Sequence, residues 1–77
     1  MALLISVAPV GEDWAIQSDA LPEDLVFRSG GRAETAARDL ARRRAADGQA
    51  AEVRIFVRGG ALAGVLTYPA MAGGPAA

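Results

Sequence analysis

The residues best suited to chemistry lie in a strand-like stretch in the second half of the chain. Arg54, Phe56 and Arg58 are spaced two apart, so a β-strand would present all three on one face. An aromatic ring between two guanidinium groups could stack on a nucleic-acid base while the arginines contact phosphates. The same side chains could instead belong to a contact between protein subunits, and the pattern alone leaves both interpretations open.

A second group of arginines precedes this stretch. Arg42, Arg43 and Arg44 form a basic run, and Arg38 lies one helical turn earlier. These four residues are a candidate basic patch. They also have a structural explanation, because cations near the C-terminus of a helix compensate its dipole. The net charge is −1 and no recognised nucleic-acid motif is present, so we favour protein interaction over nucleic-acid binding.

The composition argues against an enzyme. The 77 residues include no histidine and no cysteine, and all eight basic residues are arginine. Without these side chains no conventional Ser/His/Asp or Cys/His arrangement, no Schiff-base lysine and no disulfide can form. We therefore predict a protein with no catalytic site and no cofactor.

Two further motifs have plain structural interpretations. The acidic pairs at 12–13 and 23–24 could gather Mg²⁺ or Ca²⁺, but adjacent acids in loops are usually solvated turn residues. The segment 29–32, Ser-Gly-Gly-Arg, could bind a phosphate at a helix N-terminus, yet it lacks the spacing and the lysine of a P-loop. We predict neither a metal site nor a phosphate site.

Charge is unevenly distributed along the chain. Residues 1–27 contain five acids and no base, whereas residues 28–77 contain eight arginines and four acids. This segregation could produce a bipolar surface. We favour the alternative, in which folding interleaves the two halves and pairs their charges. Within the expected helix, acid-first spacing predicts ion pairs of Glu34 with Arg38 and of Asp39 with Arg43.

The N-terminal third has the alternation of β-strands. Residues 3–18 predict a hairpin with its turn within residues 9–13, and Leu3, Ile5 and Val7 share one strand face. Residues 25–27 are apolar and β-prone, which fits either a short edge strand or a plug leading into the helix.

Residues 32–47 predict an Ala-rich helix that ends at Gly48. Either Ser29 or Gly31 could cap its first turn. Its apolar face is made of small residues and one leucine: Ala33, Ala36, Ala37 and Leu40. Because these side chains are small, we expect the helix to lie close to the sheet.

The glycines at 59 and 60 predict a second hairpin with a two-residue turn, which pairs Val57 with Leu62. The residues then expected beneath the helix are Val53, Ile55, Val57, Leu62, Leu66 and Tyr68. Together the elements predict an α+β fold of β-β-α-β-β order, with an antiparallel four-stranded sheet and one helix packed on one face. Residues 1–68 form this domain, and residues 69–77 are expected to be a disordered Ala/Gly/Pro tail.

A sheet with one helix has one uncovered face, and an apolar patch there usually marks an interface. The candidate interaction face consists of Leu4, Arg54, Phe56, Arg58 and Val65. We predict a homodimer formed through this face, with nucleic-acid binding by an antitoxin-like or regulatory domain as the alternative. The N-terminal apolar run has no basic n-region and is too short to span a bilayer, so we expect a cytoplasmic protein without membrane contact.

The order of motifs resembles a known family. W-A-I at 14–16, F-R-S at 27–29, A-A-R-D-L-A at 36–41, A-E-V-R-I-F-V-R-G-G-A-L at 51–62 and T-Y at 67–68 are similar to the small bacterial domain-of-unknown-function family 2188. This resemblance implies the same α+β fold and no established activity. The segment from Ala20 to Ala41 also resembles HicB-type antitoxins.

Overall fold

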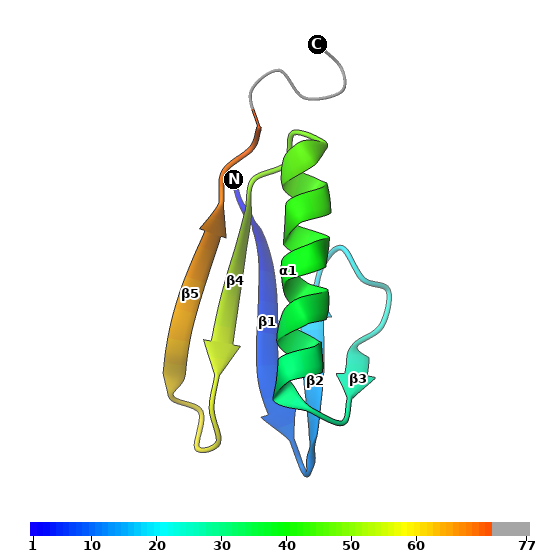
Figure 1. The fold of residues 1–77 in the computed structure, drawn as a ribbon, viewed down its shortest axis with the longest axis vertical. Helices are drawn as coiled ribbons and strands as arrows, with labels where there is room; N and C mark the ends of the chain where they lie inside the picture. Colours follow the sequence, from blue (N-terminus) through cyan, green and yellow to red (C-terminus); the bar gives the residue numbers. More distant parts are fainter. Residues whose placement is uncertain (72–77) are drawn as a thin grey trace.

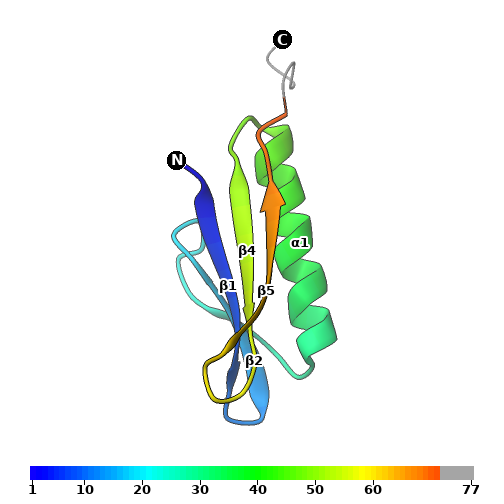
Figure 2. The same ribbon diagram turned by 90° about the vertical axis from the view of Figure 1, so that its left-hand side faces the viewer.

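A computed structural model, which describes residues 1–71, shows one sheet and one helix packed as two layers (Figure 1). The elements in chain order are β1 (Leu3–Val10), β2 (Asp13–Ser18), β3 (Leu25–Phe27), α1 (Gly30–Ala46), β4 (Ala51–Phe56) and β5 (Leu62–Tyr68). The helix lies on one face of the sheet and leaves the other face bare (Figure 2). We call this bare face the open face. The predicted α+β class is confirmed.

The sheet has five strands in the order β3-β2-β1-β4-β5, and it is mixed. The prediction of four antiparallel strands was wrong on both counts. Residues 25–27 form a true edge strand, because Phe27 pairs opposite Trp14. The helix carries the chain back along the sheet, so β4 runs parallel to β1 and Leu3 lies opposite Ala51. All other neighbouring strands are antiparallel.

Both ends of the helix are capped by local hydrogen bonds. Ser29 is the N-cap, and its hydroxyl accepts a hydrogen bond from the N–H of Arg32 at 3.1 Å. At the other end Gly48 adopts a φ of 93°, which only glycine tolerates easily. The N–H of Gln49 then donates to the carbonyl of Arg44 at 2.8 Å, closing a Schellman motif.

The helix packs on the sheet through a stripe of alanines. The fully or almost fully buried helix residues are Ala33, Ala37, Ala41 and Ala45. This stripe follows every fourth residue, so Ala36 and Leu40 from the predicted face lie at its edge and are only partly buried. The largest fully buried side chains come from the sheet: Ile5, Val7, Ile16 and Val53. The core is therefore thin, and most of its volume comes from the strands.

The last hairpin differs from the predicted two-residue turn. β4 ends at Phe56, which pairs opposite Leu62, and Ala63 is an extra residue that forms a bulge. The longer turn is closed by the N–H of Val57, which donates to the carbonyl of Ala61 at 2.9 Å. The bulge places Leu62 on the open face rather than beneath the helix. Val57 is exposed outside the strand, so its predicted burial was also wrong.

The segment after β5 returns to the end of the helix. The N–H of Met71 donates to the carbonyl of Ala45 at 3.0 Å. The remainder of the predicted tail, residues 72–77, lies outside the described residues. In the part that the structure describes, no helix has the length and hydropathy needed to cross a bilayer.

Candidate interaction face

The open face carries one continuous line of apolar side chains, which we call the apolar row. Its members, from β3 to β5, are Val26, Ala15, Ala8, Phe56 and Leu62. Strand pairing joins its neighbours directly, except at the centre. There Ala8 and Phe56 follow the last paired residues of β1 and β4, Val7 and Ile55, and so lie side by side. The row therefore crosses all five strands.

The apolar row is most exposed at its two ends. Val26 is 61% exposed and Leu62 is 50% exposed, whereas Phe56 is half-buried between its neighbours. Ala15 is only 3% exposed, although it does not belong to the core cluster on the helix side. The row therefore has larger side chains on β3, β4 and β5 and two alanines between them. A second apolar face can pack closely against a surface of this shape.

The rest of the open face is mostly polar. The next row along the strands contains Gln17, Ser6, Arg54 and Val65, and the row beyond it contains Leu4, Glu52 and Thr67. Arg54 donates to the carboxylate of Glu52 at 2.5 Å, so its charge is compensated on the same face. Leu4 and Val65, both predicted members of the interaction face, are exposed there but lie outside the apolar row.

Arg58 does not extend the alternation of Arg54 and Phe56. It lies in the turn after β4, and its Nη1 donates to the carbonyl oxygen of Gly11 at 2.6 Å. This hydrogen bond ties the β4–β5 turn to the β1–β2 turn. The predicted arrangement of two arginines flanking one ring on a strand face is therefore not formed.

A shallow hollow of about 330 Å³ lies at the far end of the open face. It is lined by Leu4, Ser6, Gln17, Ser18, Asp19 and Asp24. The amide of Gln17 donates to the carboxylate of Asp24 at 2.9 Å across it. Within residues 1–71 no three potential metal ligands of the His, Cys, Asp or Glu type come together. The hollow thus offers polar hydrogen-bonding groups but no nucleophile with an activating base.

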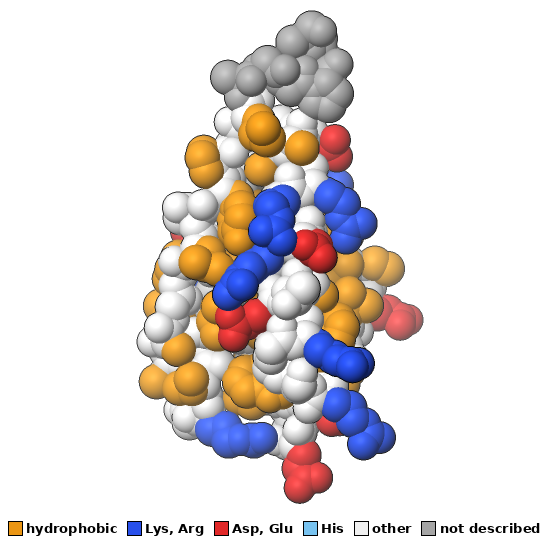
Figure 3. Space-filling model, viewed as in Figure 1, with side chains coloured by type: hydrophobic (Ala, Val, Ile, Leu, Met, Phe, Trp, Pro, Cys, Tyr) orange, Lys and Arg blue, Asp and Glu red, His pale blue; other side chains and the backbone are white. Residues whose placement is uncertain are grey.

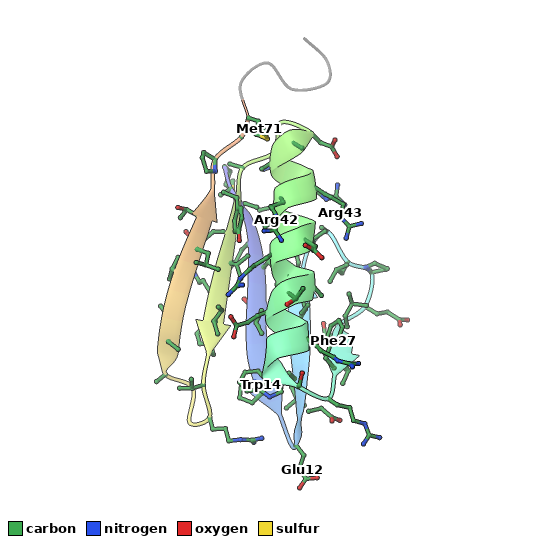
Figure 4. All side chains as sticks on the ribbon, in the orientation of Figure 1. Glu12, Trp14, Phe27, Arg42, Arg43 and Met71 are labelled. Carbon is green, nitrogen blue, oxygen red and sulfur yellow. The ribbon has the colours of Figure 1, made fainter. Side chains whose placement is uncertain are left out.

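The candidate basic patch lies on the opposite layer from the open face, and it is divided. Arg38 pairs with Glu34 at 2.9 Å, as predicted, but Asp39 pairs with Arg42 at 2.7 Å rather than with Arg43. The hydrogen bond that Arg42 donates to Asp39 raises the pKa of the Arg42 guanidinium above its ordinary value. Arg42 and Arg43 point to opposite sides of the helix (Figure 4).

The two remaining arginines of the patch line a different hollow. Arg43 and Arg44 lie with Leu21, Leu40 and Asp47 around a space of about 400 Å³ beside the C-terminal half of α1. Arg38 and Arg42 do not line this hollow. The four arginines therefore do not form one surface, and none of them shares the open face with Arg54.

In the described part of the chain, folding does not pair the acids of residues 1–27 with the arginines of the rest of the chain. Within residues 1–71 each of the three ion pairs joins two residues of the segment after residue 27, and none involves an acid of residues 1–27. The favoured prediction that folding would pair the charges of the two halves was therefore wrong. Residues 28–46 alone contain six arginines and two acids, and basic side chains are spread over the helix side of the molecule (Figure 3).

Sequence reasoning missed four of the five members of the apolar row. Ala8 and Ala15 have small side chains, which do not mark an interface by their pattern alone. Val26 has no assignable face until the pairing of β3 with β2 is known. Leu62 was placed on the wrong face because the turn was taken to be two residues long. The glycines at 59 and 60 both have positive φ, and such a pair also suits a longer turn.

Comparisons of the chain with protein-family models, with curated proteins and with solved structures each gave no match. The open face and its apolar row therefore carry the functional interpretation.

Proposed function

We propose that this protein is a small non-enzymatic interaction module that self-associates as a homodimer through its open face. One observation carries the proposal. The apolar row crosses the whole sheet on the face that the helix leaves bare, and its two ends, Val26 and Leu62, are exposed. Exposed apolar surface of this continuity is characteristic of protein interfaces.

The small core gives a physical reason for association. A chain of this size buries roughly 60% of its unfolded surface and is only marginally stable alone. Within residues 1–71 the only core lies between the sheet and the helix. Its fully buried large side chains come from the sheet, and the helix adds mainly alanines. Packing two open faces about 10 Å apart would bury the row on both copies, at ~25 cal/mol per Å² of apolar area removed from water.

The basic side chains do not oppose this contact. Arg54 is already compensated by Glu52 of the same chain. The basic side chains of α1 lie on the other layer, away from the contact. Two open faces can therefore meet at the apolar row without opposing unpaired arginines, while Asp19 and Asp24 lie at the far end around the shallow hollow.

The direct test is the replacement Phe56→Asp, followed by light scattering over a range of concentrations. We expect the molar mass to fall by half relative to the unmodified protein while the circular dichroism spectrum is retained. Thr35→Asp is the matched control, because Thr35 is exposed on the helix layer. An unchanged mass for Phe56→Asp would remove the apolar row from the interface.

Nucleic-acid binding through Arg54 and Phe56 is the alternative function, and it has weaker support. Arg54 is paired with Glu52, Arg58 is held by Gly11, and the helix arginines face the other way. If this function is correct, a labelled single-stranded oligonucleotide should bind with an affinity that falls as salt rises. Arg54→Ala should then weaken it further, and absence of salt-dependent binding would end this alternative.

A further inference from the structure

The two edges of the sheet are very different. β3 is only three residues long and follows a loop that contains Pro22. β5 is seven residues long, has no charged residue, and meets its first proline only at Pro69. An edge strand directs half of its backbone N–H and C=O groups away from the sheet, and proteins usually protect such an edge by charge, proline or short length. In the described chain β5 has none of these protections.

The regular part of β5 is also self-complementary. The bulge at Ala63 leaves Gly64–Tyr68 as an uninterrupted stretch whose central residue is Leu66. We propose that this stretch pairs antiparallel with the β5 strand of a second copy, with Leu66 on the two-fold axis. The inference rests on the proposed self-association, but it does not depend on the contact between open faces.

This register matches side chains by size and shape. A two-fold axis at Leu66 places Tyr68 of one copy opposite Gly64 of the other. An aromatic ring across from a strand glycine covers the backbone that the glycine leaves bare. Val65 then lies opposite Thr67 of the second copy, and two β-branched residues pack well as a cross-strand pair. The same contacts form twice because the interface is isologous.

Charge also selects this register over its neighbour. Arg54 lies opposite Val65, and Glu52 lies opposite Thr67 within each chain. An axis at Leu66 therefore places Arg54 of one copy on the same row as Glu52 of the other. An axis at Val65 would instead place the two copies of Arg54 on one row. The two side chains of such a row are three strand spacings apart, roughly 14 Å, so the interaction between their charges is weak. It is attractive for an axis at Leu66 and repulsive for an axis at Val65.

The paired sheet would have ten strands, with both helices on one side and both open faces on the other. Leu66 and Tyr68 are only partly buried beneath α1, because the helix lies over the middle of the sheet rather than over β5 (Figure 1). Pairing at β5 would cover both residues further. Because the axis at Leu66 reverses the strand direction, the two apolar rows would lie at opposite ends of the paired strands, both on the bare side and both free for the face contact.

The test uses the absence of cysteine from the chain. Leu66→Cys is made in the Phe56→Asp protein, which lacks the face contact, and is then oxidised mildly. Directly opposed strand residues have Cα atoms about 4.5–5.5 Å apart, which a disulfide can span. We expect a covalent dimer in high yield, and only background yield for Glu23→Cys, an exposed loop position. Because Leu66 lies on the helix side, contact between open faces cannot produce this disulfide.

Light scattering on the Phe56→Asp protein separates the two proposals. A mass of two chains together with the disulfide supports the pairing at β5. The β5 pairing is overturned if the Phe56→Asp protein is a monomer and its Leu66→Cys form gives no disulfide. If the unmodified protein is a dimer in the same experiment, the face contact still stands. If the unmodified protein is itself a monomer, both proposals fail.

A second pair of variants fixes the register without touching the core. Val65→Cys and Thr67→Cys, both at exposed positions, are prepared separately in the Phe56→Asp protein and oxidised alone and as a mixture. We expect the mixed disulfide to form several-fold more than either disulfide of one variant with itself. A predominant disulfide between two Val65→Cys chains would overturn the axis at Leu66.

Discussion

The indole of Trp14 lies against the first turn of α1, directly over Gly30 (Figure 4). A Cβ added to Gly30 would lie 3.0 Å from Cε2 and 3.2 Å from Cζ2 of the indole. These distances are shorter than ordinary van der Waals contact, and an aromatic ring cannot bend away as a flexible chain can. At Gly30 the hairpin and the helix are therefore too close for a larger residue unless one of them shifts.

Replacement of Gly30 by alanine should destabilise the protein, although alanine is the better helix former. We expect a loss of about 1 kcal/mol, because the cost of overpacking against the indole exceeds the gain in helix propensity. Gly31→Ala is the matched control, since no atom lies within 4 Å of its added Cβ, and it should stabilise by about 0.5–1 kcal/mol. Urea unfolding, followed by Trp14 fluorescence, measures both. Equal effects at the two glycines would contradict the contact.

Ser29 is the only side chain that caps the start of the helix in the described structure. We expect Ser29→Ala to lower the free energy of unfolding by about 1 kcal/mol, because the N–H of Arg32 loses its acceptor. Thr35→Ala is the control: its hydroxyl donates to a carbonyl already inside the helix, and the change should cost nothing. Thermal unfolding checks the pair, and a Ser29→Ala protein as stable as Thr35→Ala would refute the capping role.

The alanine stripe of α1 should tolerate no larger side chain. Ala37 is fully buried against the sheet, so Ala37→Leu would force the helix outward and should cost about 1–3 kcal/mol. Thr35→Leu adds a similar bulk at an exposed position of the same helix and should change stability by less than about 0.5 kcal/mol. Chemical denaturation of the two variants distinguishes them. A tolerated Ala37→Leu would mean that the layers are not closely packed.

The two leucines of β5 should respond differently to a charge. Leu62 is half-exposed on the open face, so Leu62→Asp should keep the fold and weaken self-association. Leu66 packs against the core cluster, so Leu66→Asp should cost more than about 2 kcal/mol and unfold much of the protein. Circular dichroism reports the fold and light scattering the mass. Unfolding by Leu62→Asp would instead mean that Leu62 is buried beneath the helix, as the two-residue turn predicts.

Much of the fold follows from local patterns in the sequence. The alternation of Leu3, Ile5 and Val7 correctly predicts the core face of β1, and residues 3–18 do form a hairpin. The helix appears within two residues of its predicted bounds, and Gly48 ends it as expected. These features depend on neighbours in the chain, so periodicity and capping residues are sufficient to find them.

The errors in the sheet involve partners that are distant in sequence or a turn with two solutions. The sequence of residues 25–27 does not determine which strand they pair with. The sequence of β1 does not determine that β4 runs parallel to it. Ser29 and Gly31 were equal candidates for the cap until the hydrogen bond to Arg32 decided between them. The apolar row combines one residue from each strand, so it exists only once the order and register of all five strands are known.

The parallel pairing of β1 with β4 also determines how the chain must fold. β1 lies at the centre of the sheet, and one of its two neighbours is a strand that begins only at Ala51. The ribosome therefore releases the central strand well before its second partner, with β2, β3 and α1 in between. Until then β1 has one bare side, and closing that gap carries the entropy cost of a long loop. A cut between α1 and β4 would separate β3-β2-β1 from β4-β5 along this parallel pairing, so we expect the two fragments to regain the five-stranded sheet only when they are mixed.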